Sequence, residues 1–145
     1  LSRGLGDVYK RQHKGRLLQN FQKEVQEFIN ENKDNEKLST FVKALEAAVK
    51  EVMASTMWLM QNGMQDPENA LSSASDYLNL VALTSLTYMW ARMAKFSDGK
   101  NEPQHKTKIK TGTYFIDKFI PEIQMYSKKV QSGKSTLMEM EIEEF

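Results

Sequence analysis

The stretch LSTFVKALEAAVKEVMASTMWL, residues 38–59, decides the fold because its apolar residues recur at steps of three and four. This spacing places them along one side of an α-helix, as a heptad-like seam. The seam consists of Leu38, Val42, Leu45, Val49, Val52, Thr56 and Leu59. A second row beside it consists of Met53, Met57, Met60 and Met64. We therefore expect a helix that runs to about Gln61 and buries a wider arc in its C-terminal half.

The segment before this helix has the same periodicity. Between Arg16 and about Asn32, apolar residues recur at helical spacing with Gln, Lys and Glu between them. This pattern predicts an amphipathic helix with one buried stripe. The polar run that follows ends the helix, and it offers Asp34 or Asn35 as a cap for the next element.

Downstream of the seam, Asn62-Gly63 is typical of a helix stop, because glycine adopts the left-handed backbone without strain. Asp66 as N-cap, with Pro67 at the first helical position, then predicts the start of a third helix. Apolar residues occur on all sides of this helix between Tyr77 and Ala94, which indicates a central element covered all round. The alternative of a membrane span is disfavoured, since the apolar run is short and interrupted by polar residues.

A turn-rich connection, Ser97 to Gln104, leads to a fourth helix that ends at Ser132-Gly133. Its expected apolar face consists of Ile109, Gly112, Ile116, Phe119, Ile120, Ile123, Tyr126 and Val130. Pro121 lies inside this helix and predicts a kink near Asp117 to Pro121. The acidic tail from Ser135 onward is expected to dock as a short turn. The predicted fold is all-α: an antiparallel four-helix bundle with a kinked last helix and a short C-terminal tail.

Length and composition exclude several classes of function. A chain of 145 residues, 40% hydrophobic and 27% charged, is typical of one soluble globular domain. The absence of cysteine excludes disulfides, a thiolate nucleophile and cysteine-bound metals, and two histidines leave little for a histidine site. A net charge of +1 gives no reason to expect nucleic acid or an anionic membrane as a partner.

Three short patterns resemble parts of known ligand-binding motifs, but the other residues that those motifs require are missing. The run from Gly133 to Thr136 matches the end of a phosphate-binding loop, but Lys128 stands where that motif requires glycine. Glu102 and His105 have the spacing of ligands in di-iron bundles, which require this pair twice. Three alternating lysines, Lys106, Lys108 and Lys110, are typical of a solvated face. We therefore predict no catalytic residue, no metal ligand and no cofactor-binding residue in this chain.

Two apolar features remain after this search. The methionine row is more often core filler than a binding groove, although methionine serves in both. Ala47, Ala54 and Trp58 lie roughly opposite the main buried arc of their helix and make a flat apolar facet. This facet is able to dock either another helix of the domain or a body outside it.

The beginning of the chain differs from the rest. Residues 1–12 show no helical or strand periodicity and contain no apolar core of a signal peptide. They resemble a translated sequencing-adapter scar, with a disordered natural terminus as the alternative. We therefore expect a non-native, disordered segment over 1–12 and one helical domain over 13–145.

From Leu38 onward the order of motifs resembles the C-terminal domain of one branch of the acyl-CoA dehydrogenases, that of 3-methylmercaptopropionyl-CoA dehydrogenase. The matching segments are Ala54–Leu59, Asp66–Ala70, Ala74–Leu78, Trp90–Ala94, Lys108–Phe115, Phe119–Glu122, Val130–Gly133 and Leu137-Met138. The resemblance implies a bacterial, cytoplasmic flavoprotein that removes hydrogens from Cα and Cβ of an acyl-CoA thioester. In that family a glutamate takes the α proton, FAD accepts the β hydride, and an electron-transfer flavoprotein receives the electrons.

No position of this chain matches the catalytic glutamate segment or the flavin-binding loops of that family. The resemblance therefore implies a non-catalytic fragment that carries no FAD itself and packs on an upstream dehydrogenase body or at a subunit interface of a homo-oligomer. Trp58, Trp90 and Arg92 are the predicted docking or core positions, with core packing favoured for Trp90. Two alternatives are a free-standing helical interaction module and, less favoured for lack of ligands, a metal- or cofactor-binding bundle.

Overall fold

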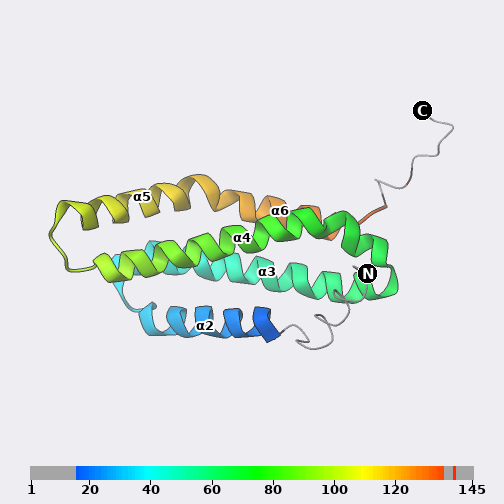
Figure 1. Ribbon diagram of the computed structural model, residues 1–145, viewed down its shortest axis with the longest axis horizontal. Helices are drawn as coiled ribbons and strands as arrows, with labels where there is room; N and C mark the ends of the chain where they lie inside the picture. The colour runs from blue at the N-terminus through cyan, green and yellow to red at the C-terminus, as the bar shows by residue number, and fades with distance from the viewer. Residues whose placement is uncertain (1–15, 136–138, 140–145) are drawn as a thin grey trace, which may run out of the picture.

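Six helical segments follow one another in the computed structural model, which describes residues 16–135 and 139. They are α2 (Arg16–Asn32), the short 3-10 helix η1 (Glu36–Leu38), α3 (Ser39–Gln65), α4 (Pro67–Ser97), α5 (Pro103–Phe119) and α6 (Pro121–Ser132). Successive long helices run in opposite directions, with α5 and α6 forming one bent arm (Figure 1). The described residues contain no strand. The predicted all-α antiparallel bundle is confirmed.

Two predictions concern parts of the chain outside the described residues. The adapter-like segment 1–12 lies outside them, and so does most of the acidic tail that was expected to dock as a turn. Both stay predictions, as does the domain boundary at residue 13.

The predicted first helix and its cap are confirmed. Helix α2 spans the predicted residues 16–32. Beyond it, Asn35 caps η1, because its Oδ1 accepts a hydrogen bond of 3.0 Å from the backbone N–H of Lys37. The sequence had offered Asn35 as one of two capping residues, and its position directly before Glu36 makes it the cap.

A single residue reverses the chain between the two longest helices. Asp66 stands between α3 and α4, and its Oδ1 accepts a hydrogen bond of 3.1 Å from the N–H of Glu68, with Pro67 at the first helical position. The predicted start of this helix is confirmed. The predicted stop at Asn62-Gly63 is wrong, because α3 continues to Gln65. A Cβ at Gly63 would lie 3.0 Å from the Cβ of Ala70, so this glycine allows α3 and α4 to approach closely just before the reversal.

The kink predicted at Pro121 is confirmed. Helix α5 ends at Phe119, α6 begins at Pro121, and the arm is bent by 38°. The N–H of Ile120 still donates to the carbonyl of Ile116 at 3.2 Å, and the interruption follows at Pro121, which has no N–H to donate. Gly133, with a φ of 67°, ends α6 at the predicted position.

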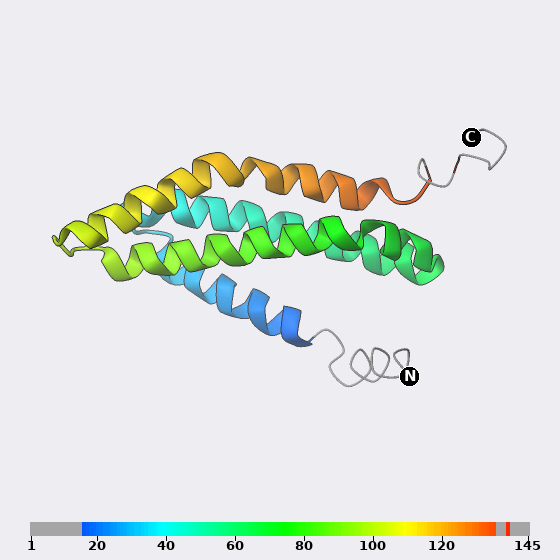
Figure 2. The ribbon, with the colours of Figure 1, turned by 45° about the horizontal axis from the view of Figure 1, so that its top comes forward.

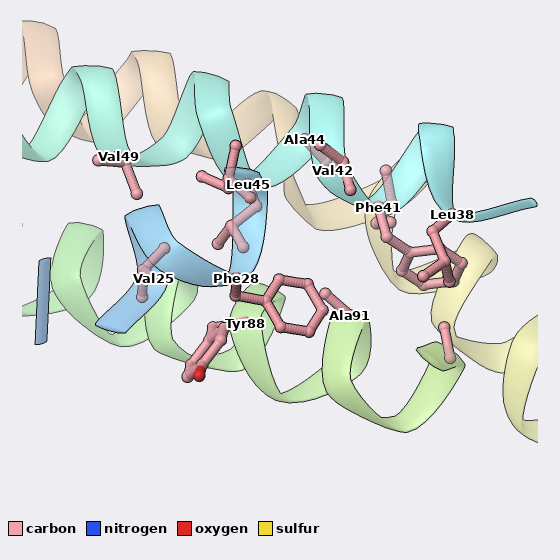
Figure 3. Close-up of a cluster of buried hydrophobic side chains, with 13 residues drawn as sticks. Val25, Phe28, Leu38, Phe41, Val42, Ala44, Leu45, Val49, Tyr88 and Ala91 are labelled. Atoms are coloured by element: carbon pink, nitrogen blue, oxygen red, sulfur yellow. The ribbon is translucent and has the colours of Figure 1, made fainter. Parts of the chain in front are cut away.

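The main core lies where α2, α3 and α4 meet (Figure 3). Val25 of α2 and Leu45 of α3 are fully buried in it. Phe28 packs edge-on against Tyr88 of α4, with ring centroids 5.5 Å apart. The Tyr88 hydroxyl donates to Glu24 at 2.8 Å, and burial together with this hydrogen bond raises the pKa of Tyr88 to about 12. The first five residues of the predicted α3 seam are buried, whereas its last two, Thr56 and Leu59, are half-buried.

Small polar residues bring α6 close to α3 and α4. Ser55 of α3 and Ser127 of α6 are buried and lie 3.2 Å apart, oxygen to oxygen. Ser73 of α4 is also buried, and it donates to the carbonyl of Val130 at 2.9 Å. Because a serine is small and each hydroxyl finds a partner, these helices approach without leaving a polar group unsatisfied. No local pattern in the sequence distinguishes these serines from solvated ones.

An ionic cluster holds the end of α6 on the start of α4. The Lys134 ammonium lies 2.6 Å from the carboxylate of Asp66 and also pairs with Glu68. The backbone N–H of Lys134 donates to Asn69 Oδ1 at 3.1 Å. The hydrogen bond from Lys134 lowers the pKa of Asp66 below its ordinary 3.8, and the hydrogen bond to Asp66 raises the pKa of Lys134 above 10.5.

We predict that Gly112→Leu destabilises the domain. A Cβ at Gly112 would lie 2.8 Å from Phe41 Cε1 and 3.1 Å from Trp90 Cε3, so a larger side chain overpacks the contact. The expected loss of unfolding free energy is about 1–3 kcal/mol, measured by urea denaturation followed by circular dichroism. Thr111→Leu, at the exposed neighbouring position, is the matched control and should change stability by about 0.5 kcal/mol or less. Equal midpoints for the two variants would contradict the close packing of α5.

We also predict a pH window for the stabilisation that the Lys134 cluster provides. The pKa of Asp66 is lower in the folded chain than in the unfolded chain, so its ionised form stabilises the fold above pH 3.8, and this stabilisation is lost as the pH falls through the folded pKa. The pKa of Lys134 is higher in the folded chain, so its charged form stabilises the fold below pH 10.5, and this stabilisation is lost as the pH rises through the folded pKa. The difference in unfolding midpoint between the natural chain and Lys134→Gln should therefore be flat between these limits and shrink outside them. Lys128→Gln, an exposed lysine of α6, should show no such profile.

Candidate interaction surfaces

The most prominent outward features of the described residues are two exposed apolar surfaces. Residues 16–135 and 139 contain no group of three or more His, Asp or Glu side chains placed to hold a metal ion. None of the helices in that part of the chain is long and apolar enough to cross a membrane. The exposed side chains are therefore the candidates for a functional role.

The residues of the three motif-like patterns have structural roles or face solvent. Lys134, in the phosphate-loop-like run, is engaged by Asp66 and Glu68. His105 is buried, with Nδ1 3.1 Å from the Ser97 hydroxyl and Nε2 4.0 Å from Glu102, so it joins the end of α4 to the start of α5. The three alternating lysines of α5 are all exposed, as a solvated face requires.

The methionine row of α3 is exposed, so the prediction that the C-terminal half of this helix buries a wider arc is wrong. The exposed fractions are 54% for Met53, 63% for Met57, 63% for Met60 and 82% for Met64. The buried residues of α2 all lie between Val25 and Asn32, and Figure 2 shows α2 diverging from α3 and α4 toward its N-terminal end. The row is uncovered because α2 leaves the bundle beside it.

This divergence opens a groove of about 460 Å³, which we call the methionine groove. It is lined by Gln22 of α2 and by Met53, Ala54, Thr56, Met57, Met60 and Gln61 of α3. Three of the seven lining residues are methionines, whose flexible thioethers adapt to the shape of a partner. The groove therefore has the chemistry of a docking site for an apolar surface.

A second exposed surface runs along α4, and the prediction that this helix is covered all round is wrong. The other long helices of the described chain, α2, α3, α5 and α6, pack on the inner side of α4. No described helix lies beyond α4 on the other side. The opposite side forms what we call the outer stripe: Leu71, Leu78, Ala82, Leu86, Met89 and Phe96. The five larger side chains among them are 48–75% exposed. The spacing of the stripe was visible in the sequence, but its exposure was not.

The three predicted docking or core residues lie in different places. Trp58 is half-buried against the end of α6, since a Cβ at Gly133 would lie 3.2 Å from its Cη2 atom. Trp90 is half-buried under α5, with its ring 6.2 Å from that of Phe115. Arg92 is exposed, with its guanidinium 5.5 Å from the centre of the Tyr88 ring. The structure therefore does not bring the three together into one site.

Comparison with protein families gives one match. The family model described as acetyl-CoA dehydrogenase C-terminal like matches residues 21–141. The match covers both exposed surfaces and every described helix except the start of α2. A comparison with curated proteins found no match.

We predict that the methionine row reacts with solvent oxidants in the folded chain. Dilute hydrogen peroxide should convert Met57, Met60 and Met64 to sulfoxides faster than Met93, which is only half-exposed. Peptide mass spectrometry after short exposures measures the rates, and circular dichroism checks that the chain stays folded. Faster oxidation of Met93 would contradict the exposed position of the row.

Proposed function

The chain belongs to the acetyl-CoA dehydrogenase C-terminal like family, and from that premise we propose that it is the non-catalytic helical domain that follows the catalytic body of an FAD-dependent acyl-CoA dehydrogenase. The reaction proposed for the parent enzyme is α,β-dehydrogenation of an acyl-CoA thioester, with electrons passed to an electron-transfer flavoprotein. The role proposed for this domain is to pack on the body.

We propose no flavin site on this domain. Among the described residues, no buried side-chain nitrogen or oxygen lacks a hydrogen-bond partner, so no buried polar atom points to a missing ligand. The lining of the methionine groove contains no charged side chain, since its polar groups come from two glutamines and a threonine. We propose that flavin and substrate bind to the body.

The position and the lining of the methionine groove support the proposal that the domain docks on the body. Its wall includes Gln22, in the second turn of α2, so the groove lies beside the point where preceding chain would enter the domain. A body joined there is held close to the groove at a high effective concentration, which makes even a modest apolar contact effective. Methionine side chains are suited to such a contact because they repack against an irregular surface.

The finer assignment of the parent rests on the resemblance of the motifs. We propose the branch of 3-methylmercaptopropionyl-CoA dehydrogenase, a bacterial source and a cytoplasmic location on that ground.

A free-standing interaction module is the second candidate, because an exposed methionine row also suits the apolar face of a partner helix. The reading frame upstream of residue 13 separates the two candidates. A dehydrogenase-like frame supports the C-terminal domain, whereas an upstream start codon with no dehydrogenase-like frame supports the module.

We predict that the methionine groove is covered in the parent enzyme. Peroxide should oxidise Met57 and Met60 at least about tenfold more slowly in the parent than in the isolated chain, while Met125, exposed on α6, keeps its rate. The isolated chain should show no flavin absorbance and no acyl-CoA turnover.

Met57→Lys combined with Met60→Lys should weaken the contact between the domain and the body in the parent, measured as faster release of the domain by trypsin.

Thr40→Lys, at an exposed position near the start of α3, is the matched control for the added charge and should leave the release rate unchanged. Equal oxidation of Met57 in both proteins would overturn the docking proposal. Stoichiometric flavin on the isolated chain would overturn the division between body and domain.

A further inference from the structure

A further pocket, of about 390 Å³, lies between the second half of α2 and the end of α4. It is lined by Phe28 of α2 and by Arg92, Lys95 and Phe96 of α4, and we call it the aromatic pocket. It shares no residue with the methionine groove. Its volume falls within the range of about 300–1,000 Å³ that is usual for small-ligand sites.

Helical spacing gathers the three side chains of α4 at this pocket. Arg92 precedes Lys95 by three residues and Phe96 by four, so all three lie on one face of the helix. Phe28 of α2 lies against the same part of α4 through its contact with Tyr88. The Phe28 side chain is buried, whereas Phe96 is 63% exposed. The pocket therefore has one aromatic ring on its inner side and another on its solvent side.

Arg92 supplies the positive charge of this pocket that no described acidic residue neutralises. The Lys95 ammonium pairs with Glu31 at 3.2 Å and lies 5.3 Å from the centre of the Phe28 ring. Among the described residues, Arg92 forms no ion pair. Its guanidinium is positioned 5.5 Å from the centre of the Tyr88 ring, a cation–π contact that leaves its N–H groups available to a ligand.

The other charged groups near the pocket are engaged elsewhere. Glu24 accepts a hydrogen bond of 2.8 Å from the Tyr88 hydroxyl. The Lys100 ammonium lies over the Phe96 ring, 3.2 Å from its centre, and does not line the pocket. A ligand in the pocket therefore meets one uncompensated positive charge, that of Arg92.

We propose that the aromatic pocket binds a small planar aromatic molecule that carries one carboxylate. The carboxylate accepts hydrogen bonds from the fork of the Arg92 guanidinium, whose geometry matches it. The aromatic ring of the ligand packs against Phe28 and Phe96. A single uncompensated charge favours a monoanion over a phosphate ester, which carries close to two negative charges. The inference concerns the chain itself and holds whether or not a catalytic body precedes α2.

Isothermal titration calorimetry of the full chain with naphthoate tests the site. We expect one binding site per chain. Arg92→Gln should weaken the affinity at least about tenfold, because it removes both the charge and the fork of donors. Lys106→Gln, at an exposed position of α5, removes the same charge outside the pocket and should leave the affinity unchanged. Circular dichroism should show unchanged helix content for both variants, since both positions are exposed.

Three related probes separate the contribution of the ring from that of the charge. Naphthalenemethanol lacks the charge, decahydronaphthoate lacks the planar ring, and naphthyl phosphate carries additional charge. Each should bind at least about fivefold more weakly than naphthoate. Equal binding of the alcohol overturns the role of Arg92, and equal binding of the saturated acid overturns the role of the aromatic walls. Equal or tighter binding of the phosphate overturns the assignment of a carboxylate.

Two further variants locate the bound probe. Phe96→Ala should weaken naphthoate binding at least about fivefold, because it removes the solvent-side ring. Met57→Lys, in the methionine groove, should leave the affinity unchanged. Loss of binding in Met57→Lys alone would place the probe in the methionine groove and overturn the aromatic pocket, as would a chain that binds no naphthoate at millimolar concentration. Neither outcome bears on the docking of the domain on the body, which is tested separately in the parent enzyme.

Discussion

The reversal at Asp66 is the constraint on which the rest of the structure depends. One residue connects α3 to α4, so two helices of 27 and 31 residues must fold back along each other. Asp66 makes this reversal stable by capping α4 with its carboxylate, and Lys134 binds the same carboxylate from the end of α6. The other elements are added to this pair: α2 covers one side and the arm of α5 and α6 covers another.

The added helices do not cover the pair completely, and the exposed remainder is where function is expected. Helix α2 packs through its second half and diverges beside the methionine row, which leaves the methionine groove open. The described helices that pack on α4 lie on its inner side, so the outer stripe is exposed in this part of the chain. The two surfaces differ in chemistry. The groove is lined mainly by flexible methionines, whereas the stripe carries mainly leucines with one methionine and one phenylalanine.

Local signals predicted the helices well and their surroundings poorly. The bounds of α2, the Asp66 and Asn35 caps and the bend at Pro121 all depend on residues within a few positions of each other. Gly63 was misleading because the same residue type serves as a helix stop and as a point of close approach, and only the position of Ala70 distinguishes the two. The buried Ser55, Ser73 and Ser127 carried no signal, because a serine in a helix is ordinarily solvated.

The sequence by itself determined the helical class, the order of the helices and the side of α3 that faces the core, because periodicity and capping are local properties of the chain. It also placed apolar residues along the methionine row and the outer stripe. Only the tertiary structure decided that these two rows face solvent. Burial depends on how far neighbouring helices reach and in which direction they diverge, and no residue in either row encodes the length or the angle of α2, α5 and α6.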